Sequence, residues 1–233
     1  MVNCTLLNTA PFDVFAHMAA DELFATGPEE GNFLRFFNWR EKPSATFGYA
    51  QFVKSVRAQL ESAGIEEYTR RPTGGGIVLH KDDLTFSLVF NSPMLENPRV
   101  IYAALHGFIK EELLQIKTGI SAYESASDYR PAAGGNALSC FQNPVKDDLL
   151  NSSGDKILGG AIRRFGSRVL YQGSLQSAGV RGNALCVAAV KKAVLKYLGA
   201  SAYIQRSLST EETDKILSLA KNQYMTRQWI EKF

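Results

Sequence analysis

Three runs of strand-forming residues in the second half of the chain follow one another with only short turns between them. They cover residues 148–151, 156–165 and 168–176. Strands joined by such short connections pair antiparallel, because two parallel neighbours need a crossover of a dozen or more residues. The pattern predicts an α+β fold with a central mixed, largely antiparallel sheet flanked by helices, and it disfavours the strand–helix alternation of a doubly wound sheet.

Other segments have the periodicity of further strands and helices. Runs rich in aromatic and β-branched residues predict strands at 33–38, 45–49, 68–70 and 122–129, and a hairpin made of 77–79 and 84–90. Apolar residues at helical spacing predict helices at 13–26, 53–63, 97–117 and 182–198. We expect a last helix to begin at Ser209, because Ser209 and Glu212 have the spacing of a capping box.

The composition is that of an ordinary globular protein, and it disfavours several classes of function. The 233 residues carry 26 Lys and Arg against 23 Asp and Glu, and a net charge of +3 is too weak to indicate nucleic acid binding. Neither a membrane span nor a signal peptide is predicted. Three widely spaced cysteines favour a reducing cytoplasm, and the absence of CxxC and HExxH patterns argues against a metal site. We expect one domain over residues 1–233.

Three consecutive glycines follow two arginines in the run Arg70-Arg71-Pro72-Thr73-Gly74-Gly75-Gly76. Glycines let the backbone approach a ligand closely, and their N–H groups can point at an anion or a carbonyl. The run has neither the lysine of a P-loop nor the spacing of a dinucleotide-binding fingerprint. Taken alone, it is also typical of a flexible hairpin turn.

Lys156 opens an apolar strand just before the run Gly159-Gly160-Ala161. A lysine at such a position is partly removed from water and places a single strong donor beside backbone that a ligand can approach. Arg163 and Arg164 follow on the same strand and add positive charge. The alternative is an ordinary lysine at a solvated turn.

Cys140 lies in a predicted loop, within Ser139-Cys140-Phe141, before Lys156. A thiol becomes a better nucleophile when cations lie nearby, although a lone cysteine is also often buried and inert. His80 ends the strand after the glycine loop. It either lines the same pocket as the loop or is a structural histidine.

Taken together, these segments resemble the lipoate–protein ligase and octanoyltransferase family, which is related to biotin protein ligase. The resemblance covers about residues 10 to 180. The matching stretches are residues 17–22, 34–39, 45–51, 70–80, 83–87, 156–164 and 172–175. One departure is Gln172, where some members have histidine.

The resemblance implies a central mixed sheet flanked by helices and a tunnel for a medium-chain acyl group. It implies that Lys156 contacts the acyl carbonyl or an acyl-adenylate and is catalytic. It further implies that the acyl group is bound by residues of the two glycine motifs: Arg71, Thr73, Gly74, Gly75, Gly76, His80, Gly159, Gly160 and Ala161. Arg70, Arg163 and Arg164 are expected to contact a phosphate or an acidic partner.

The family divides by chemistry, and the sequence favours its transferase branch. One transferase branch carries its nucleophile in a Cys-Phe context before the lysine, as Cys140-Phe141 does here. Many ligases also have a C-terminal accessory domain, for which the residues after the last motif leave no room. We therefore expect an octanoyl or lipoyl transferase that needs no cofactor, takes octanoate from acyl carrier protein and acylates a lysine of lipoyl-domain proteins.

Two alternatives remain open from the sequence. The first is a lipoate–protein ligase that activates free lipoate with ATP and Mg and passes it on from lipoyl-AMP. The second is a non-catalytic relative that binds lipoyl domains or a small acid.

Overall fold

The centre of the molecule is a large mixed sheet that runs through most of the chain. The computed structural model describes the chain apart from residues 1–2, 93–96, 117–119, 123–140 and 142–143. Within these described residues the large sheet has eight strands, in the order β11 (Tyr203–Ser207), β1 (Cys4–Asn8), β2 (Asn32–Phe36), β6 (Leu84–Asn91), β10 (Arg168–Leu175), β9 (Lys156–Phe165), β8 (Leu149–Asn151) and β7 (Ile120–Ala122). The pairs β11–β1 and β1–β2 are parallel and all the others are antiparallel. The predicted fold class is confirmed.

A smaller sheet lies beside the large one. Its order is β4 (Glu67–Arg70), β3 (Ser44–Phe47) and β5 (Val78–His80), with β3 parallel to β4 and antiparallel to β5. The predicted hairpin of residues 77–79 and 84–90 is therefore wrong. The strand β5 pairs with β3, whereas β6 pairs with β2 and β10. Residues 81–83 carry the chain from one sheet to the other, and local turn chemistry does not show which partner a strand takes.

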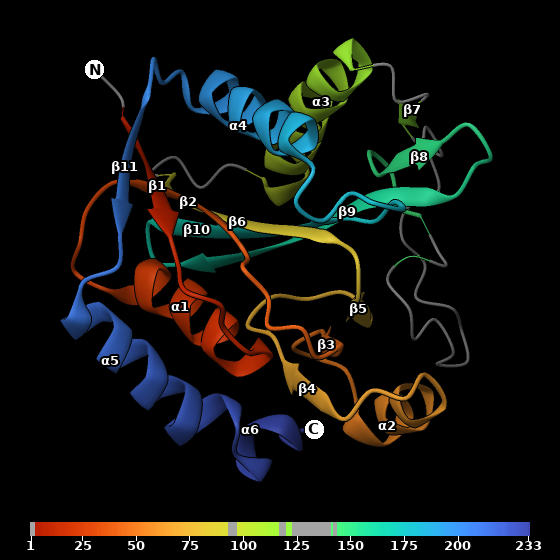
Figure 1. Ribbon diagram of the computed structural model, residues 1–233, viewed down its shortest axis with the longest axis vertical. Coiled ribbons are helices and arrows are strands. Elements are labelled where there is room, and N and C mark those ends of the chain that lie inside the picture. The colour runs from red at the N-terminus through yellow and green to blue at the C-terminus, as the bar shows by residue number, and fades with distance from the viewer. Residues whose placement is uncertain (1–2, 93–96, 117–119, 123–140, 142–143) are drawn as a thin grey trace.

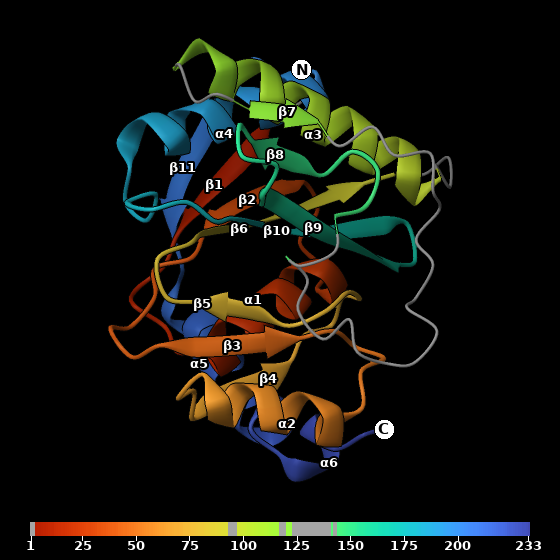
Figure 2. The same ribbon diagram turned by 90° about the vertical axis from the view of Figure 1, so that its right-hand side faces the viewer.

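The helices cover both faces of the large sheet, as Figures 1 and 2 show. On one face lie α3 (Pro98–Gln115) and α4 (Ala184–Leu198), which pack against each other and against the apolar side chains of the sheet. On the other face lie α1 (Val14–Thr26), α5 (Thr210–Leu219) and the small sheet with α2 (Val53–Ser62). A π-helical turn, η1 (Ala220–Tyr224), and the short helix α6 (Arg227–Ile230) end the chain beside β4.

The two central strands alternate apolar and polar side chains, yet both faces are buried. Phe86 and Leu88 of β6, with Tyr171 of β10, point into the core under α3 and α4. The polar residues of the same two strands that point the other way are Thr85, Ser87, Gln172 and Ser174, and they are all buried as well. Such alternation usually indicates a sheet with one face in water. Here α1 and the small sheet cover the polar face, so its hydroxyl and amide groups need partners inside the protein.

The elements predicted from local periodicity are largely confirmed. The five long helices are present, and Ser209 and Glu212 form the capping box at the start of α5. The strand β11 was not anticipated from the sequence. Apart from Ala122, the strand predicted at 122–129 lies outside the described residues.

Two buried histidines make the stability of the fold depend on pH. Burial lowers the pKa of His17 well below its usual 6.5, and the charge of Arg35 lowers it further. Burial also lowers the pKa of His106 to about 3. Both rings are therefore neutral in the folded protein at pH 6, whereas the unfolded chain takes up a proton on each.

We predict that the free energy of unfolding falls as the pH drops from 6.5 to 5, by up to about 1.4 kcal/mol per pH unit for each of these histidines. The sign follows because the unfolded state binds more protons in this range. Urea unfolding at several pH values measures the slope. In His106→Gln the slope of the free energy of unfolding against pH should decrease by about 1.4 kcal/mol per pH unit, the contribution of one proton. An unchanged slope would show that His106 titrates normally in the folded state.

Candidate active site

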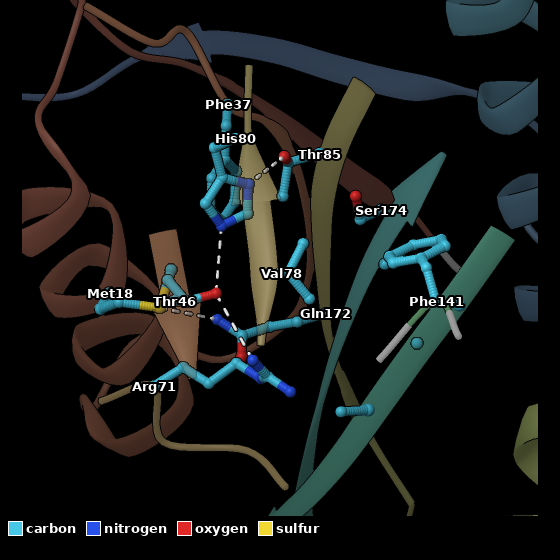
Figure 3. A pocket seen from close by; sticks show the side chains of 14 residues that line it. Met18, Phe37, Thr46, Arg71, Val78, His80, Thr85, Phe141, Gln172 and Ser174 are labelled. Carbon is cyan, nitrogen blue, oxygen red and sulfur yellow. Dashed lines mark hydrogen bonds between the residues drawn. The ribbon is translucent and has the colours of Figure 1, made fainter. Parts of the chain in front are cut away.

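A hollow lies between the polar face of the large sheet and the small sheet (Figure 3). Its volume is about 400 Å³ with its open mouth included, but the free interior is only about 30 Å³, the room of roughly two waters. Figure 3 shows Arg71, Thr46 and Met18 on one side and Phe141 on the opposite side. The lining residues are Met18, Phe37, Thr46, Arg71, Val78, His80, Thr85, Phe141, Gly159, Gly160, Ala161, Gln172, Gly173 and Ser174.

The glycines at the floor of this pocket are required by close packing. A Cβ atom at Gly160 would lie 2.5 Å from the ring of Tyr171, and one at Gly173 would lie 2.7 Å from the rings of Phe86 and Tyr171. At Gly159 a Cβ would meet Lys156, at 2.5 Å from Cε and 2.8 Å from Nζ. The glycines thus let Tyr171 of β10 and Lys156, the first residue of β9, lie directly on the backbone of β9.

Lys156 is buried next to the pocket, with 8% of the residue exposed. Its Nζ lies 2.7 Å from Oδ2 of Asp148, which is fully buried, and 5.3 Å from the ring centroid of Phe141. A second hollow is also bordered by Phe141 and is lined by Lys156, Pro144 and Gln176 among others; its volume is about 760 Å³ with its open mouth included, and its free interior is about 430 Å³. Lys156 therefore lies at the boundary between two hollows rather than in the lining of the first.

A network around Asp83 holds His80 in place at the top of the pocket. Nδ1 of His80 lies 3.0 Å from Asp83 Oδ2, and Nε2 lies 3.0 Å from the hydroxyl of Thr46. Asp83 also accepts hydrogen bonds from Thr85 and Ser174. Burial alone would raise the pKa of Asp83, but His80 and the two hydroxyl groups outweigh burial and lower it. The carboxylate is thus kept charged inside the protein.

A second network joins the two sheets through Gln172. Its Nε2 donates to Asp21 of α1 at 2.6 Å, and its Oε1 accepts from the hydroxyl of Thr73 at 2.5 Å. Asp21 also forms a buried ion pair with Arg35, at 2.5 Å, and accepts from Ser87. Thr73 itself is buried and anchors the start of the glycine loop.

The loop of three glycines lies at the rim rather than in the lining. Gly74 and Gly75 are exposed and Gly76 is half-buried. The carbonyl of Gly74 accepts from Arg71, at 3.0 Å from Nε. Gly48 is fixed by the loop, since a Cβ there would lie 1.8 Å from the oxygen of Gly75, which has a φ of +89°. Of the site residues predicted from this motif, Arg71 and His80 line the pocket.

The three remaining arginines occupy different environments. Arg70 is fully buried and donates to the carbonyl groups of Gln51, Trp229 and Ile230, among others, so it ties β4 to the end of the chain. This geometry does not support the expected contact of Arg70 with a phosphate or a partner. Arg163 and Arg164 are half-buried. Arg163 donates to the carbonyl of Pro72 at 2.8 Å, and Arg164 donates to that of Ser92.

The expected nucleophile, Cys140, lies outside the described residues. Its neighbour Phe141 is described, and its ring borders both hollows and Lys156. The other two thiols are buried: burial raises the pKa of Cys4 to about 12 and raises that of Cys186 as well.

The described part of the chain contains no cluster of three His, Cys, Asp or Glu side chains that could hold a metal ion. None of its helices is long and apolar enough to span a membrane.

Comparison with models of protein families shows which family the chain belongs to. The model of the lipoyl protein ligase A/B catalytic domain matches residues 13–196, which include α1, the pocket and Lys156. The chain belongs to this family. The predicted resemblance is confirmed over most of its length.

Curated relatives of this family member are named octanoyltransferase LipM. The protein from Oceanobacillus iheyensis is 30% identical over 182 residues, which cover 72% of this chain and 62% of that protein. The protein from Symbiobacterium thermophilum is 30% identical over 185 residues, covering 74% and 65%. The aligned region thus spans less than two thirds of the length of these relatives.

Solved structures of similar shape show the lipoate ligase fold. A T. acidophilum protein with bound lipoic acid superposes with a TM-score of 0.77 at 20% identity, over 99% of this chain and 100% of that one. Lipoate-protein ligase A bound with ATP gives a TM-score of 0.75 at 20% identity, over 99% of both chains. At this identity the likeness concerns the fold.

Several residues of the site were not singled out from the sequence. Asp148 and Tyr102 have no motif around them, and only the tertiary structure shows that they reach Lys156 and Gly160. Thr85, Ser87 and Ser174 had a detectable signal, because polar side chains alternate with large apolar ones in both strands.

We predict that Gly159→Ala destabilises the protein by about 1–3 kcal/mol, because the new methyl group overlaps the side chain of Lys156 and forces it to move. Gly107→Ala is the matched control. Gly107 lies exposed in α3, a Cβ there meets nothing within 4 Å, and alanine should be neutral or stabilising by about 0.5–1 kcal/mol. Urea unfolding compares the two, and equal stabilities would contradict the packing described for Gly159.

Proposed function

We propose that this chain transfers an octanoyl group to a lysine of a lipoyl-domain protein through a thioester on Cys140. The observation that carries the proposal is the buried amine of Lys156 against Gly159, at the edge of the pocket and beside Phe141, the sequence neighbour of Cys140. The relatives named octanoyltransferase LipM support the same reaction.

In the first step the thiolate of Cys140 attacks the thioester carbonyl of an octanoyl-acyl carrier protein. A new carbon–sulfur bond forms, the bond to the carrier sulfur breaks, and the carrier thiolate leaves and takes up a proton. Lys156 donates a hydrogen bond to the oxyanion that develops on the carbonyl oxygen. An ammonium has three donors, so its pairing with Asp148 does not by itself exhaust them.

In the second step the amine of the acceptor lysine attacks the thioester on Cys140. The amide bond forms as the carbon–sulfur bond breaks, and the proton lost by the amine goes to the departing thiolate of Cys140. Lys156 stabilises the same oxyanion in this step. The enzyme thiol is restored, and no cofactor is consumed.

The pocket between the sheets is the proposed place of the acyl chain. Its polar side chains hydrogen-bond to one another, as Gln172 does to Thr73 and His80 to Thr46, and leave carbon surface toward the hollow. Burial of each methylene contributes about 0.8 kcal/mol, so discrimination between chain lengths should be modest per carbon. The free interior of about 30 Å³ means that lining side chains must move apart when the chain enters.

A second candidate is a lipoate–protein ligase that uses ATP and Mg and works through lipoyl-AMP. The likeness of the fold to lipoate-protein ligase A, which was solved bound with ATP, favours it. In that reaction Arg163 and Arg164 of β9 would face phosphate groups. A bi-partite ligase from Thermoplasma acidophilum has also been studied with its E2 lipoyl domain, which supports a lipoyl-domain acceptor for either reaction.

We predict that incubation with octanoyl-acyl carrier protein adds one octanoyl mass to the chain without ATP, and that Cys140→Ala abolishes the adduct. Cys186→Ala is the control, because its thiol is buried in α4 and should contribute nothing. Intact mass spectrometry gives the readout. An adduct that survives in Cys140→Ala would contradict the thioester, lipoate-dependent ATP–pyrophosphate exchange in that variant would favour the ligase, and no turnover in any arm would favour a non-catalytic protein.

We predict that Lys156→Met lowers the rate of octanoyl transfer by about 10²–10³-fold, the usual effect of losing one oxyanion donor. The single variant also leaves the buried charge of Asp148 unpaired, which is itself destabilising. The double variant Lys156→Met/Asp148→Asn removes that charge and should recover stability but not activity. Stopped assays of amide formation, with thermal unfolding alongside, separate the two effects. Recovery of transfer in the double variant would show that Lys156 has only a structural role.

A further inference from the structure

A second group of polar side chains, largely removed from water, lies on the opposite side of β9 from the pocket. It consists of His106 of α3, Tyr171 of β10 and Asp148 just before β8, which are all buried, together with Tyr102 of α3, which is half-buried. This face of the sheet is otherwise packed with apolar residues under α3 and α4. Polar groups buried there cost free energy unless they are hydrogen-bonded, and none of them lines the pocket.

The hydroxyl of Tyr102 connects α3 to β9 and to the residue that precedes β8. It accepts a hydrogen bond from the N–H of Gly160, at 3.0 Å, and donates one to Oδ1 of Asp148. Burial raises the pKa of Tyr102 well above its usual 10, and the charge of Asp148 raises it further. The hydroxyl therefore keeps its proton and remains a donor to the carboxylate.

Asp148 in turn holds the amine of Lys156. Its Oδ2 accepts from the N–H of Val145 at 2.6 Å and lies 2.7 Å from Nζ of Lys156. Three donors from three segments therefore converge on one carboxylate: a backbone amide, the lysine, and the Tyr102 hydroxyl. A carboxylate bound in this way has one orientation, and the amine follows it.

His106 packs against Tyr102 and helps to hold its ring in place. Its ring centroid lies 3.9 Å from that of Tyr102. Burial lowers its pKa to about 3, and the charge of Lys156 contributes to the lowering, so the ring is neutral. Because Nδ1 faces the carbonyl of Asp147 at 2.8 Å, it carries the proton, and Nε2 accepts from the hydroxyl of Tyr171.

The backbone beside Asp148 is held in an uncommon conformation. Asp147 has a φ of +71° and is the one residue other than glycine with a positive φ in the described part of the chain. Aspartate tolerates a positive φ better than most residues do. Such a backbone conformation still costs free energy, and it persists in a native structure where surrounding contacts maintain it. The hydrogen bond from His106 to the Asp147 carbonyl is such a contact.

We propose that Tyr102 is a positioning residue for acyl transfer, whose hydroxyl fixes Asp148 and the Gly160 amide and thereby places the amine of Lys156 against Gly159. The proposal rests on the proposed function of Lys156. A lysine has a flexible four-carbon stem, so an amine that must meet a developing oxyanion gains from being held in advance. Tyr102 acts through Asp148, because it does not itself line the pocket.

The test is Tyr102→Phe, which keeps the ring and removes only the hydroxyl. We expect kcat for octanoyl transfer to fall by about 10–100-fold, the range known for residues that orient the ligands of a catalytic metal, which act in a comparable way. KM for octanoyl-acyl carrier protein should stay within about twofold, because Tyr102 touches no proposed substrate atom. Tyr203→Phe is the matched control: its hydroxyl donates to the Lys191 carbonyl at 2.7 Å, in β11 at the far edge of the sheet, and kcat should not change.

A second measurement does not depend on turnover. The ¹⁵N–¹H signal of the Lys156 ammonium is assigned by its absence in Lys156→Met, and it should shift or broaden in Tyr102→Phe but not in Tyr203→Phe. If the wild-type chain transfers octanoate and Tyr102→Phe has the same kcat, the positioning role is wrong while the proposed function stands. If the wild-type chain transfers nothing, the proposed function fails. An ammonium signal unchanged in Tyr102→Phe then also overturns the positioning role.

Discussion

The structure depends on covering the polar face of β6 and β10. Hydroxyl and amide groups on that face cannot reach water once α1 and the small sheet lie over it, so they must find partners there. Gln172 provides hydrogen bonds to two elements at once, since it donates to Asp21 of α1 and accepts from Thr73 of the glycine loop. At the other end of the pocket, Asp83 forms hydrogen bonds with His80 and Ser174. The pocket is the space that these two networks leave between them.

The two faces of β9 contact different parts of the protein, and the glycines of this strand allow close packing on both. Toward the small sheet, Gly159 and Ala161 line the hollow in which we place the acyl chain. Toward α3, Gly160 accommodates the ring of Tyr171 and donates its N–H to Tyr102. The motif is therefore more than a flexible contact with ligand. Its missing side chains let the buried Lys156 and Tyr171 lie against the same backbone.

Much of this could be predicted from local pattern. The helices, the antiparallel succession at 148–176 and the capping box at Ser209 follow from periodicity and turn chemistry, which act over a few residues. The positions of Arg71, His80 and Gly159–Ala161 at one pocket agree with the two motifs that contain them. The interpretation of Arg70 as a phosphate or partner contact was less successful. Arg70 is next to Arg71 in the sequence, but its guanidinium is buried against the carbonyl groups of Trp229 and Ile230.

The sequence by itself determined the fold class, the family and the two glycine motifs, because short turns, side-chain periodicity and the order of motifs are properties of the chain alone. Only the tertiary structure decided that β5 leaves β6 for a second sheet, and that Asp148 and Tyr102 reach Lys156 from separate elements. Strand partners and buried ion pairs depend on which distant segments meet. The free energy of such contacts comes from desolvation and packing in the assembled core, which no local pattern encodes.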